Sequence, residues 1–419
     1  MNPSWPDSPS GGSLGDGRFA HAIDRPGTVD ELRDAVKARV AESLAIYPQG
    51  GTTALDYGGI PRLPGVAIDT KGLNRVVDYP AADMTITVEA GITLGALQAV
   101  LHEQHQRLLI DAPNPEQATI GGIYATNTSG PRRFGAGGPR DQILGVSFVN
   151  GEGALLKGGG RVVKNVAGYD FPKLLTGSLG TLGIITQVTL KVRPLPEASA
   201  LVWIPRRSLE SLEATLNQLN TSSTRPVALE VLNRQAAIKL DATRDLPIAD
   251  WHIVVGFEDN ATSVNWQIQQ ILPEHKEWNI KIVRGEDAKP LWSALTDFQA
   301  AEIGPLTFRA NLRPSLVASF LNRLDPELWA LQVRAGNGLV FGHWLGTDSM
   351  DAVQPILDAL RAEAVAGGGN LVLPRCPTLW KSSLKVWGEP RGDWPLAERL
   401  KKALDPRGVL NPGRFIASI

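Results

Sequence analysis

The chain has 419 residues, of which 43% are hydrophobic and 20% charged, and its 42 basic and 43 acidic residues leave a formal net charge of -1. This length predicts two or three domains, and the composition is typical of a folded globular protein. The near-zero net charge argues against nucleic acid as a partner, and against an anionic membrane as the main partner.

The scarcity of cysteine and the scatter of histidine limit the metal chemistry of the chain. Cys376 is the only cysteine, which excludes internal disulfides, cysteine-rich zinc sites and a self-contained iron–sulfur cluster, and it fits a reducing cytosol. Of the six histidines only His102 and His105 lie close together, and no carboxylate-rich motif accompanies them. We therefore predict no metal site.

The hydropathy and the N-terminus predict a cytoplasmic protein. No run of about 18 apolar residues occurs, so no segment is expected to span a membrane. Residues 1–17 lack the basic and apolar regions of a signal peptide, and we expect them to form a disordered lead-in.

The first expected elements are a capped helix and a strand. The stretch "RPGTVDELRDAVKARV" predicts a helix, with Thr28 as its N-cap and Glu31 at the capping-box position. The strand "SLAIY" follows and leads into "YPQGGTTALDYGG", residues 47–59. A strand that gives way at once to glycines indicates that something lies close against the backbone.

Short strands and a second helix come next. Strand formers cluster in "GVAIDT", "RVVDY" and "MTITVEA". The stretch "TLGALQAVLHEQH" has helical spacing, with Thr93 as its N-cap.

Residues 111–142 are rich in Gly, Pro and Asn, and they are too long for an ordinary connection. Long loops of this kind are often functional, so this region is a candidate for the site. A hairpin is expected next, around Asn150 and Gly151, between the strands "LGVSFVN" and "GALLKGG".

Glycine and tryptophan divide the chain near residue 196. Of the 43 glycines 29 precede residue 200, whereas ten of the eleven tryptophans follow it. The strand "GIITQVTLKV" ends in "RPLPEA", residues 193–198, which is a candidate domain boundary. We expect close backbone approach in the first half and bulky side-chain packing in the second.

Strand-like and helix-like runs alternate in the second half. The expected strands are "ALVWI", "WHIVVGFE", "WNIKIV" and "LVFGHWL", and the expected helices are "SLESLEATLNQL", "SVNWQIQQIL" and "SMDAVQPILDALRAEA". This order predicts βαβ units over one face of an antiparallel sheet. The tail predicts a basic helix that stops at Asp405 and Pro406, followed by a Pro/Gly loop.

Three glycine-rich loops, each beside an expected strand, share a common chemistry. Residues 50–53 could form an anion-binding nest of backbone amides, although a simple strand connection is equally compatible with this loop alone. Gly, Thr, Ser and Asn recur in residues 115–130 and 177–188. No Gly-Lys-Ser/Thr and no helix-opening G-x-G-x-x-G occurs, which disfavours a P-loop and a nicotinamide enzyme. Together the loops suit a long ligand with a pyrophosphate.

The motifs "YPQGGTTALDYGG", "ATIGGIYATNTSG", "RVVKNVAGYDFPKLLTGSLGTLGIIT" and "LDPRGVLNPGRF" resemble the FAD-binding oxidoreductases of the vanillyl-alcohol oxidase (PCMH) type. The resemblance covers about residues 20–195 and the last forty. The stretches "GGRVVKNVAGYD" and "DPRGVLNPGRF" are similar to the smaller FAD-binding subunits of bacterial glycolate oxidases (glycolate dehydrogenases).

The resemblance implies an α+β fold in distinct parts. A two-part FAD-binding domain would span residues 18–196, and an α/β cap domain with an antiparallel sheet would span 197–370. A C-terminal segment, 371–419, would pack back on the FAD site.

The resemblance also implies a non-covalent FAD and assigns roles to matching residues. The first loop would wrap the pyrophosphate, residues 119–127 would contact the pyrophosphate and the flavin end, Gly183 and Ile184 would lie by the adenosine or ribitol portion, and Asn411 would approach the flavin. The full set of expected cofactor residues is Pro48, Gln49, Gly50, Gly51, Thr52, Thr53, Pro113, Thr119, Ile120, Gly121, Gly122, Ala125, Thr126, Asn127, Gly183, Ile184 and Asn411.

Two departures from the family pattern concern this cofactor site. Members with covalent flavin carry a histidine in the first loop, where this chain has Gly51, Thr52, Thr53 and Ala54. Leu179 stands where the family often has Glu, so any contact that this Glu makes is missing.

Catalytic residues are less clearly marked. Oxidation of a 2-hydroxy acid on a flavin needs a base for the hydroxyl proton and a cation for the carboxylate. The Glu-His-Gly stretch of the larger catalytic relatives is absent, and the nearest stretch contains the solitary His343. The weak candidates are His343, Arg309, Arg313, Arg375 and Lys381, and for each a packing or ion-pairing role is the stronger alternative.

The resemblance implies the FAD-binding subunit of a complex that oxidises glycolate to glyoxylate. A larger flavin subunit would be one partner, and an iron–sulfur subunit would accept the electrons. Such a complex would be cytoplasmic or peripheral on the inner face of the cell membrane. A stand-alone FAD dehydrogenase for another 2-hydroxy acid such as D-lactate, and a non-catalytic flavin-holding assembly subunit, are the alternatives.

Overall fold

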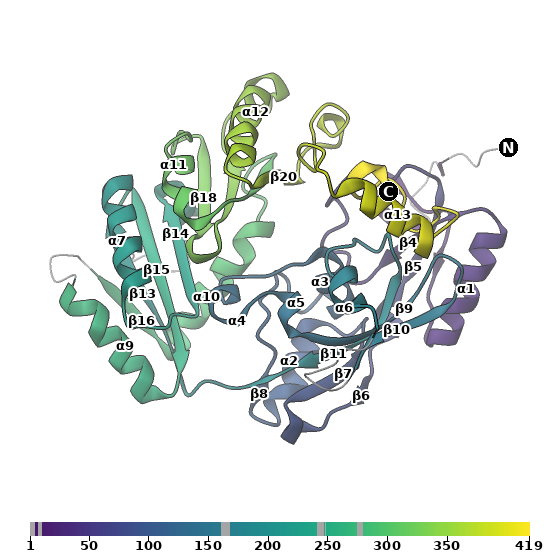
Figure 1. Cartoon of the computed structure of the whole chain (residues 1–419), viewed down its shortest axis with the longest axis horizontal. Coiled ribbons are helices and arrows are strands. Elements are labelled where there is room, and N and C mark those ends of the chain that lie inside the picture. Colours follow the sequence, from purple (N-terminus) through teal and green to yellow (C-terminus); the bar gives the residue numbers. More distant parts are fainter. Residues whose placement is uncertain (1–4, 7–10, 161–167, 241–246, 248, 275–279) are drawn as a thin grey trace. The chain divides into compact units, whose positions relative to one another are not determined.

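The computed structural model describes residues 5–6, 11–160, 168–240, 247, 249–274 and 280–419 (Figure 1). Residues 161–167, which carry "RVVKNVA" of the family motif, lie outside the described residues. By contacts the chain divides into two compact units. Unit 1 comprises Met1–Thr128, Gly138–Leu195 and Glu389–Ile419, and unit 2 comprises Ser129–Gly137 and Pro196–Gly388.

A small parallel sheet begins unit 1. Its strands β3 (Ile23–Asp24), β5 (Gly65–Asp69) and β4 (Ala45–Gln49) lie in that order. Helix α1 (Val29–Ala41) begins as expected at Thr28, whose side chain accepts a hydrogen bond from Glu31 N. The apolar face of α1 packs on β4 and β5 through a shared buried cluster, because its buried residues recur at helical spacing.

A five-stranded antiparallel sheet forms the larger part of unit 1. Its order is β10 (Leu155–Gly159), β9 (Ile143–Val149), β11 (Ile184–Lys191), β7 (Thr85–Glu89) and β6 (Val76–Asp78). The expected hairpin joins β9 to β10, with Val149 opposite Leu155. The accompanying helices are α2 (Leu94–His102), α3 (Ile120–Thr126), α5 (Pro139–Gln142) and α6 (Phe171–Leu175), and a two-stranded ribbon pairs β8 (Gln106–Arg107) with β12 (Arg193–Pro194).

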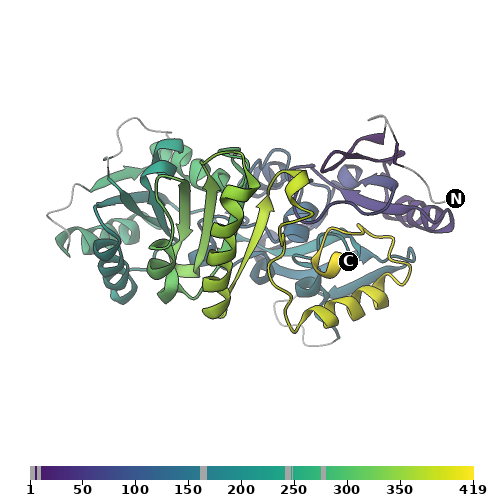
Figure 2. The same cartoon turned by 90° about the horizontal axis from the view of Figure 1, so that it is seen from above.

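The C-terminal segment, yellow in Figures 1 and 2, returns to unit 1. Helix α13 (Trp394–Leu404) ends at Asp405, as the tail sequence predicts. Beyond it, Leu410 bridges Ile46 in parallel and so extends the sheet at β4. The return starts later than residue 371, because β20 (Asn370–Arg375) pairs with β17 (Thr307–Asn311) in the sheet of unit 2.

The expected disordered lead-in is ordered at its end. Strand β1 (Ser13–Gly15) pairs with β2 (Arg18–Phe19), and Leu14 is buried. Asp16 forms a 2.8 Å ion pair with the buried Arg414. Residues from the end of the chain therefore hold this stretch, a long-range contact that local composition does not reveal.

Unit 2 is built on an eight-stranded antiparallel sheet. Its order is β16 (Lys281–Arg284), β13 (Ala198–Arg206), β15 (Trp251–Asp259), β14 (Ala228–Asn233), β18 (Trp329–Arg334), β19 (Leu339–Trp344), β17 and β20. Its helices are α4 (Arg133–Ala136), α7 (Leu209–Thr221), α8 (Arg234–Lys239), α9 (Ala261–Glu274), α10 (Lys289–Asp297), α11 (Val317–Leu321) and α12 (Met350–Ala366). Apart from the additional helices α8, between β14 and β15, and α10, between β16 and β17, the chain order is βαββαβ twice, and the two repeats meet where β14 pairs with β18.

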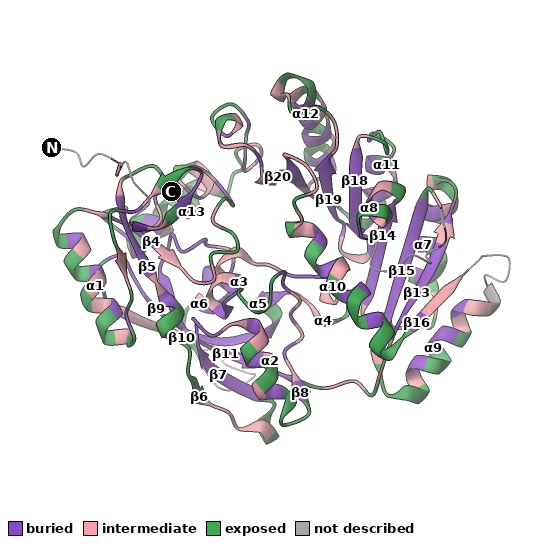
Figure 3. Ribbon diagram, turned by 180° about the vertical axis from the view of Figure 1, so that it is seen from behind, coloured by how far each residue is buried: buried purple, intermediate pink, exposed green. Residues whose placement is uncertain are grey.

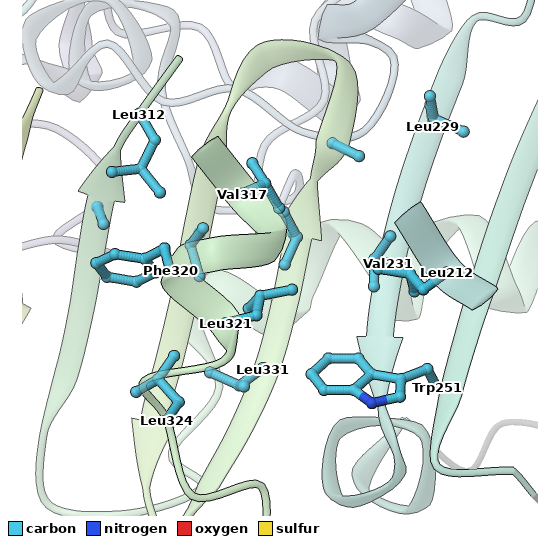
Figure 4. Packing of buried hydrophobic residues seen from close by; sticks show 14 of the residues in the cluster. Leu212, Leu229, Val231, Trp251, Leu312, Val317, Phe320, Leu321, Leu324 and Leu331 are labelled. Atoms are coloured by element: carbon cyan, nitrogen blue, oxygen red, sulfur yellow. The ribbon is translucent and has the colours of Figure 1, made fainter. Parts of the chain in front are cut away.

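Helices cover both faces of this sheet, not one as the sequence predicts. Alternate strand residues pack against α7, α9, α11 and α12 in one cluster, and the residues between them pack against α8 and α10 in another (Figure 1). Val317, Phe320 and Leu321 of α11 lie against the strands in Figure 4. The strands are accordingly buried along most of their length, while the helices expose their outer faces (Figure 3).

No helix of the described chain is long and apolar enough to cross a membrane.

Candidate functional site

Four segments of unit 1 are joined by direct hydrogen bonds, and each contains expected cofactor residues. Asn411 N donates to Ile46 O over 2.8 Å, and Asn411 Nδ2 donates to Leu179 O over 2.6 Å. Leu179 N in turn donates to Ala125 O over 2.8 Å. The end of β4, the loop after α3, the turn at 178–181 and the C-terminal segment therefore form one connected cluster.

The loop after β4 has backbone donors with no acceptor in the part of the chain that the structure describes. Among the described residues, the amides of 50–53 have no hydrogen-bond partner. Thr52 has a left-handed backbone, with φ of 58°, and successive amides around such a residue form an anion-binding concavity. These four donors fit a pyrophosphate without a lysine clamp.

The glycines of this loop make room first for the neighbouring loop. A Cβ on Gly51 would lie 1.7 Å from Gln117 O, and one on Gly50 would lie 2.1 Å from Thr119 Oγ1. Gln49 and Thr70 add a link, because Thr70 Oγ1 donates to Gln49 O over 2.9 Å. The loop that contains Gln117 and Thr119 therefore lies directly against this backbone.

The amides of residues 120–122 donate within the chain, and the cofactor contacts expected of residues 119–122 stay a prediction. The Thr119 hydroxyl caps α3 by accepting from Gly122 N over 3.2 Å, and the amides of Ile120 and Gly121 donate to Ile92 O and Ala90 O. These amides are therefore already satisfied within the chain. A Cβ on Gly122 would meet only Thr119 Oγ1, at 3.2 Å, so open space lies beside this glycine.

The remaining expected cofactor residues contribute unequally. Thr126 Oγ1 donates to Gly122 O and contacts Thr128 Oγ1, and Asn127 has a φ of 54°. Pro113 is buried, and Pro48 lies beside Gly180. Ile120 and Ile184 place their side chains in hydrophobic clusters, so only their backbones are available to a ligand. Gly183 is fixed by Phe148, whose ring lies 2.4 Å from where its Cβ would be.

The sequence did not point to several polar residues at this cluster. Ser178 Oγ is buried and has no hydrogen-bond partner among the described residues, which leaves a donor for a bound group. Lys401 and Asp405 form a buried 2.7 Å ion pair whose ammonium also donates to Thr181 O. Their i, i+4 spacing on the tail helix was the available signal.

His343 is held as a structural residue of unit 2. Its Nδ1 lies 2.9 Å from Thr307 Oγ1, and its Nε2 lies 2.7 Å from Phe298 O. Since a carbonyl can only accept, Nε2 carries the proton and Nδ1 accepts from the threonine. Burial lowers the pKa of His343 from 6.5 to about 4, so the ring is neutral near pH 7.

The four basic candidates lie in different surroundings. Arg375 donates to Gly304 O over 2.5 Å, and Arg313 is exposed. Lys381 is buried after β20. Arg309 is half-buried on β17, directly opposite Phe341 of β19. Of the four, Arg309 alone lies on a strand in mid-sheet with part of its side chain accessible.

Several buried polar side chains of unit 2 bind one another. Arg132 forms a bidentate pair with Glu258, with Nη2 to Oε1 at 2.7 Å, and its guanidinium lies 3.9 Å from the ring centroid of Trp292. Gln332 Nε2 donates to Glu230 Oε2 over 2.7 Å. Within the described part of the chain, no group of three His, Cys, Asp or Glu side chains could hold a metal ion.

Two family models match the chain. Residues 20–159 match the FAD binding domain, and residues 388–415 match the C-terminal domain of FAD linked oxidases. The mitochondrial D-lactate dehydrogenase [cytochrome] of Arabidopsis thaliana is 34% identical over 419 residues, covering 93% of this chain and 72% of that protein.

Other relatives match in part. A D-2-hydroxyglutarate dehydrogenase of Xanthomonas citri pv. viticola is 35% identical over 191 residues, and glycolate oxidase subunit GlcE of Escherichia coli is 33% identical over 202 residues. These matches span 46% and 48% of this chain, and 40% and 56% of the respective relatives. A solved alkyldihydroxyacetonephosphate synthase shares the fold, with a TM-score of 0.66 at 19% identity over 93% of this chain and 75% of that one.

Proposed function

Because the chain belongs to the FAD-dependent oxidoreductases of the vanillyl-alcohol oxidase (PCMH) type, we propose that it holds a non-covalent FAD and serves in the oxidation of a small 2-hydroxy acid. Glycolate, oxidised to glyoxylate, is the substrate that we propose first. Names of relatives support the substrate class, since glycolate, D-lactate and D-2-hydroxyglutarate are all 2-hydroxy acids.

The unpartnered amides of residues 50–53 are the observation on which this proposal chiefly rests. They lie in a connected cluster that contains the other expected cofactor segments. None of these residues is buried, so their amides are accessible to a bound diphosphate, and the left-handed backbone of Thr52 is a costly conformation of the kind found at ligand-binding loops. Thr52 and Thr53 stand in this loop where a tethering histidine would stand, which supports non-covalent binding.

The chain's own residues would bind the cofactor, orient the substrate and exclude water from the site. Bound FAD supplies two-electron oxidation and can release its electrons one at a time. The substrate carboxylate needs a cation, and a guanidinium suits this role because it can bind a carboxylate through two parallel hydrogen bonds. His343 has both ring nitrogens engaged and a lowered pKa, which argues against its use as the base.

The similarity to GlcE supports the proposal that this chain acts as a subunit of a complex. A larger flavin subunit would be one partner and an iron–sulfur subunit the electron acceptor, with the complex in the cytoplasm or on the inner face of the cell membrane. A second candidate, a stand-alone D-lactate dehydrogenase, is favoured by the match to the Arabidopsis thaliana enzyme over 93% of this chain.

Dye-linked turnover of the purified chain, with and without co-purified partners, separates these candidates. Flavin content per chain is measured first, and a purified chain that takes up no FAD would contradict the cofactor proposal. Glycolate oxidation that requires partners supports the complex, whereas turnover of D-lactate by the isolated chain supports the second candidate.

A further inference from the structure

A buried ammonium group joins two of the cofactor segments. Lys401 extends from α13, and only 8% of its side chain is exposed. Its Nζ donates to Thr181 O over 2.8 Å and to Leu410 O over 2.7 Å, and it pairs with Asp405 Oδ2 at 2.7 Å. An ammonium has three donors, so all three are used.

The carboxylate of the pair orders the chain on the other side. The Asp405 side chain is completely buried, and it accepts hydrogen bonds from Val409 N over 3.1 Å and from Leu410 N over 2.8 Å. The turn at Gly151 closes over it, since a Cβ there would lie 2.3 Å from Asp405 Oδ1. The residues that it fixes directly precede Asn411.

Both ends of this pair lead to the expected flavin contacts. Thr181 follows the turn whose Leu179 O accepts from Asn411 Nδ2. Leu410 bridges Ile46 at the end of β4, just before residues 50–53. One buried pair therefore sets the position of the 178–181 turn and of residues 409–411 relative to each other.

Stability alone does not explain a charged pair at this place. Burial of an ammonium and a carboxylate carries a desolvation cost, and hydrophobic residues of similar volume often serve as well. Burial lowers the pKa of Lys401, while Asp405 opposes that shift. What an apolar pair could not supply is the set of directed hydrogen bonds to the two cofactor segments.

We propose that Lys401 and Asp405 are positioning residues for the flavin, which hold residues 178–181 and 409–411 in binding geometry before FAD arrives. They act through main-chain groups and do not touch the cofactor. The proposal rests on the cofactor part of the proposed function, namely that FAD binds against these segments.

The test removes both charges together and measures cofactor affinity. Apoprotein of the wild type, of the double variant Lys401→Met/Asp405→Leu and of the exposed neighbour control Lys402→Met is titrated with FAD by flavin fluorescence. We expect the double variant to keep its circular dichroism and to bind FAD about tenfold or more weakly, since preorganisation is lost. We expect Lys402→Met to match the wild type.

The outcomes separate the two proposals. If the wild type takes up FAD and the double variant binds it equally well, the positioning role is overturned. If the wild type itself takes up no FAD, the proposed function fails before any variant is compared.

Hydrogen exchange on the wild-type protein gives a second test, which does not depend on whether a variant folds. We expect the amides of Leu179 and Asn411 to be protected to the same extent without and with FAD. Those of residues 50–53 should gain protection only when FAD binds. Free exchange at Leu179 and Asn411 in the apoprotein would overturn the proposal.

Discussion

All eleven non-glycine residues with a left-handed backbone among the described residues lie in unit 1, and none lies in unit 2. Four of the eleven occur in the connected cofactor cluster, one in each segment: Thr52, Asn127, Leu179 and Asn411. Unit 2 has regular strands and helices instead, and several of its buried polar side chains form internal pairs. Left-handed backbone at non-glycine residues therefore gathers in unit 1, whereas unit 2 is built of regular strands and helices.

Under the proposed function, this contrast separates a surface that binds FAD from a structural scaffold. Left-handed backbone at a non-glycine residue costs about 1–3 kcal/mol and persists only where the surroundings enforce it. In unit 1 the enforcing groups include the bond from Asn411 to Leu179 and the bonds of Lys401. In unit 2, several polar groups of the same kinds form internal pairs. We therefore expect substitutions in unit 2 to change stability, and substitutions in the cofactor cluster to change flavin affinity.

The largest expected effect comes from Arg132→Met, which leaves Glu258 buried without its bidentate partner. Only 2% of the Glu258 side chain is exposed, so unit 2 should lose about 3–5 kcal/mol of stability. Denaturant unfolding followed by tryptophan fluorescence reports this unit, because nine of the eleven tryptophans fall within Pro196–Gly388. The double variant Arg132→Met/Glu258→Met should recover most of the loss. A single variant as stable as the wild type would contradict the contrast.

The second effect is a pH dependence that arises from His343. Its pKa is lowered from 6.5 to about 4, so between these values the unfolded chain takes up a proton that the folded chain does not. As the pH falls from 6.5 to 4, unit 2 should therefore lose about 3 kcal/mol of stability through this residue. Above pH 6.5 the residue should cause no loss of stability. We expect His343→Gln to flatten this part of the profile relative to the wild type. The exposed His102→Gln should not, and equal profiles for all three proteins would refute the assignment.

Helix starts, the hairpin and the glycine-rich loops could be predicted because their signals are local. Thr28 with Glu31, and Asn150 with Gly151, lie within a few residues of the structure that they specify. The glycine loops were recognisable because left-handed or crowded backbone restricts which residues can stand there.

Features that depend on residues far apart in the chain were not predicted. Leu14 is ordered by Arg414, and the second helical layer on the sheet of unit 2 arises from α10, which no expected helix covered. The hydrogen bond from Gly121 N to Ala90 O is another such long-range contact, and the cofactor contacts expected of Gly121 and Gly122 stay a prediction. Periodicity shows that a face is buried, but not which segment buries it.

The third prediction compares two glycines of the cofactor cluster. Gly51→Ala places a Cβ against Gln117 O, and the overpacking should cost about 1–3 kcal/mol of stability in unit 1. Gly122→Ala meets only Thr119 Oγ1 and replaces a helix-interior glycine, so the fold should be retained. We nevertheless expect Gly122→Ala to weaken FAD binding about tenfold, because it fills open space beside the cofactor loops. FAD titration and thermal unfolding of both apoproteins check this, and unchanged affinity in Gly122→Ala would place the flavin elsewhere.

The smallest effect should come from Thr52→Gly, which relieves strain at the amides proposed to bind pyrophosphate. A β-branched residue with a φ of 58° costs about 1–2 kcal/mol, and the added flexibility of glycine returns roughly half of that, for a net gain of about 0.5 kcal/mol in the apoprotein. FAD affinity should fall slightly, since the loop is less ordered before binding. Asn127→Gly is the matched control, because asparagine tolerates the left-handed region and little strain is released. Thermal unfolding of the three apoproteins measures the difference, and a Thr52→Gly apoprotein less stable than Asn127→Gly would show that the strain of unit 1 is not stored at this loop.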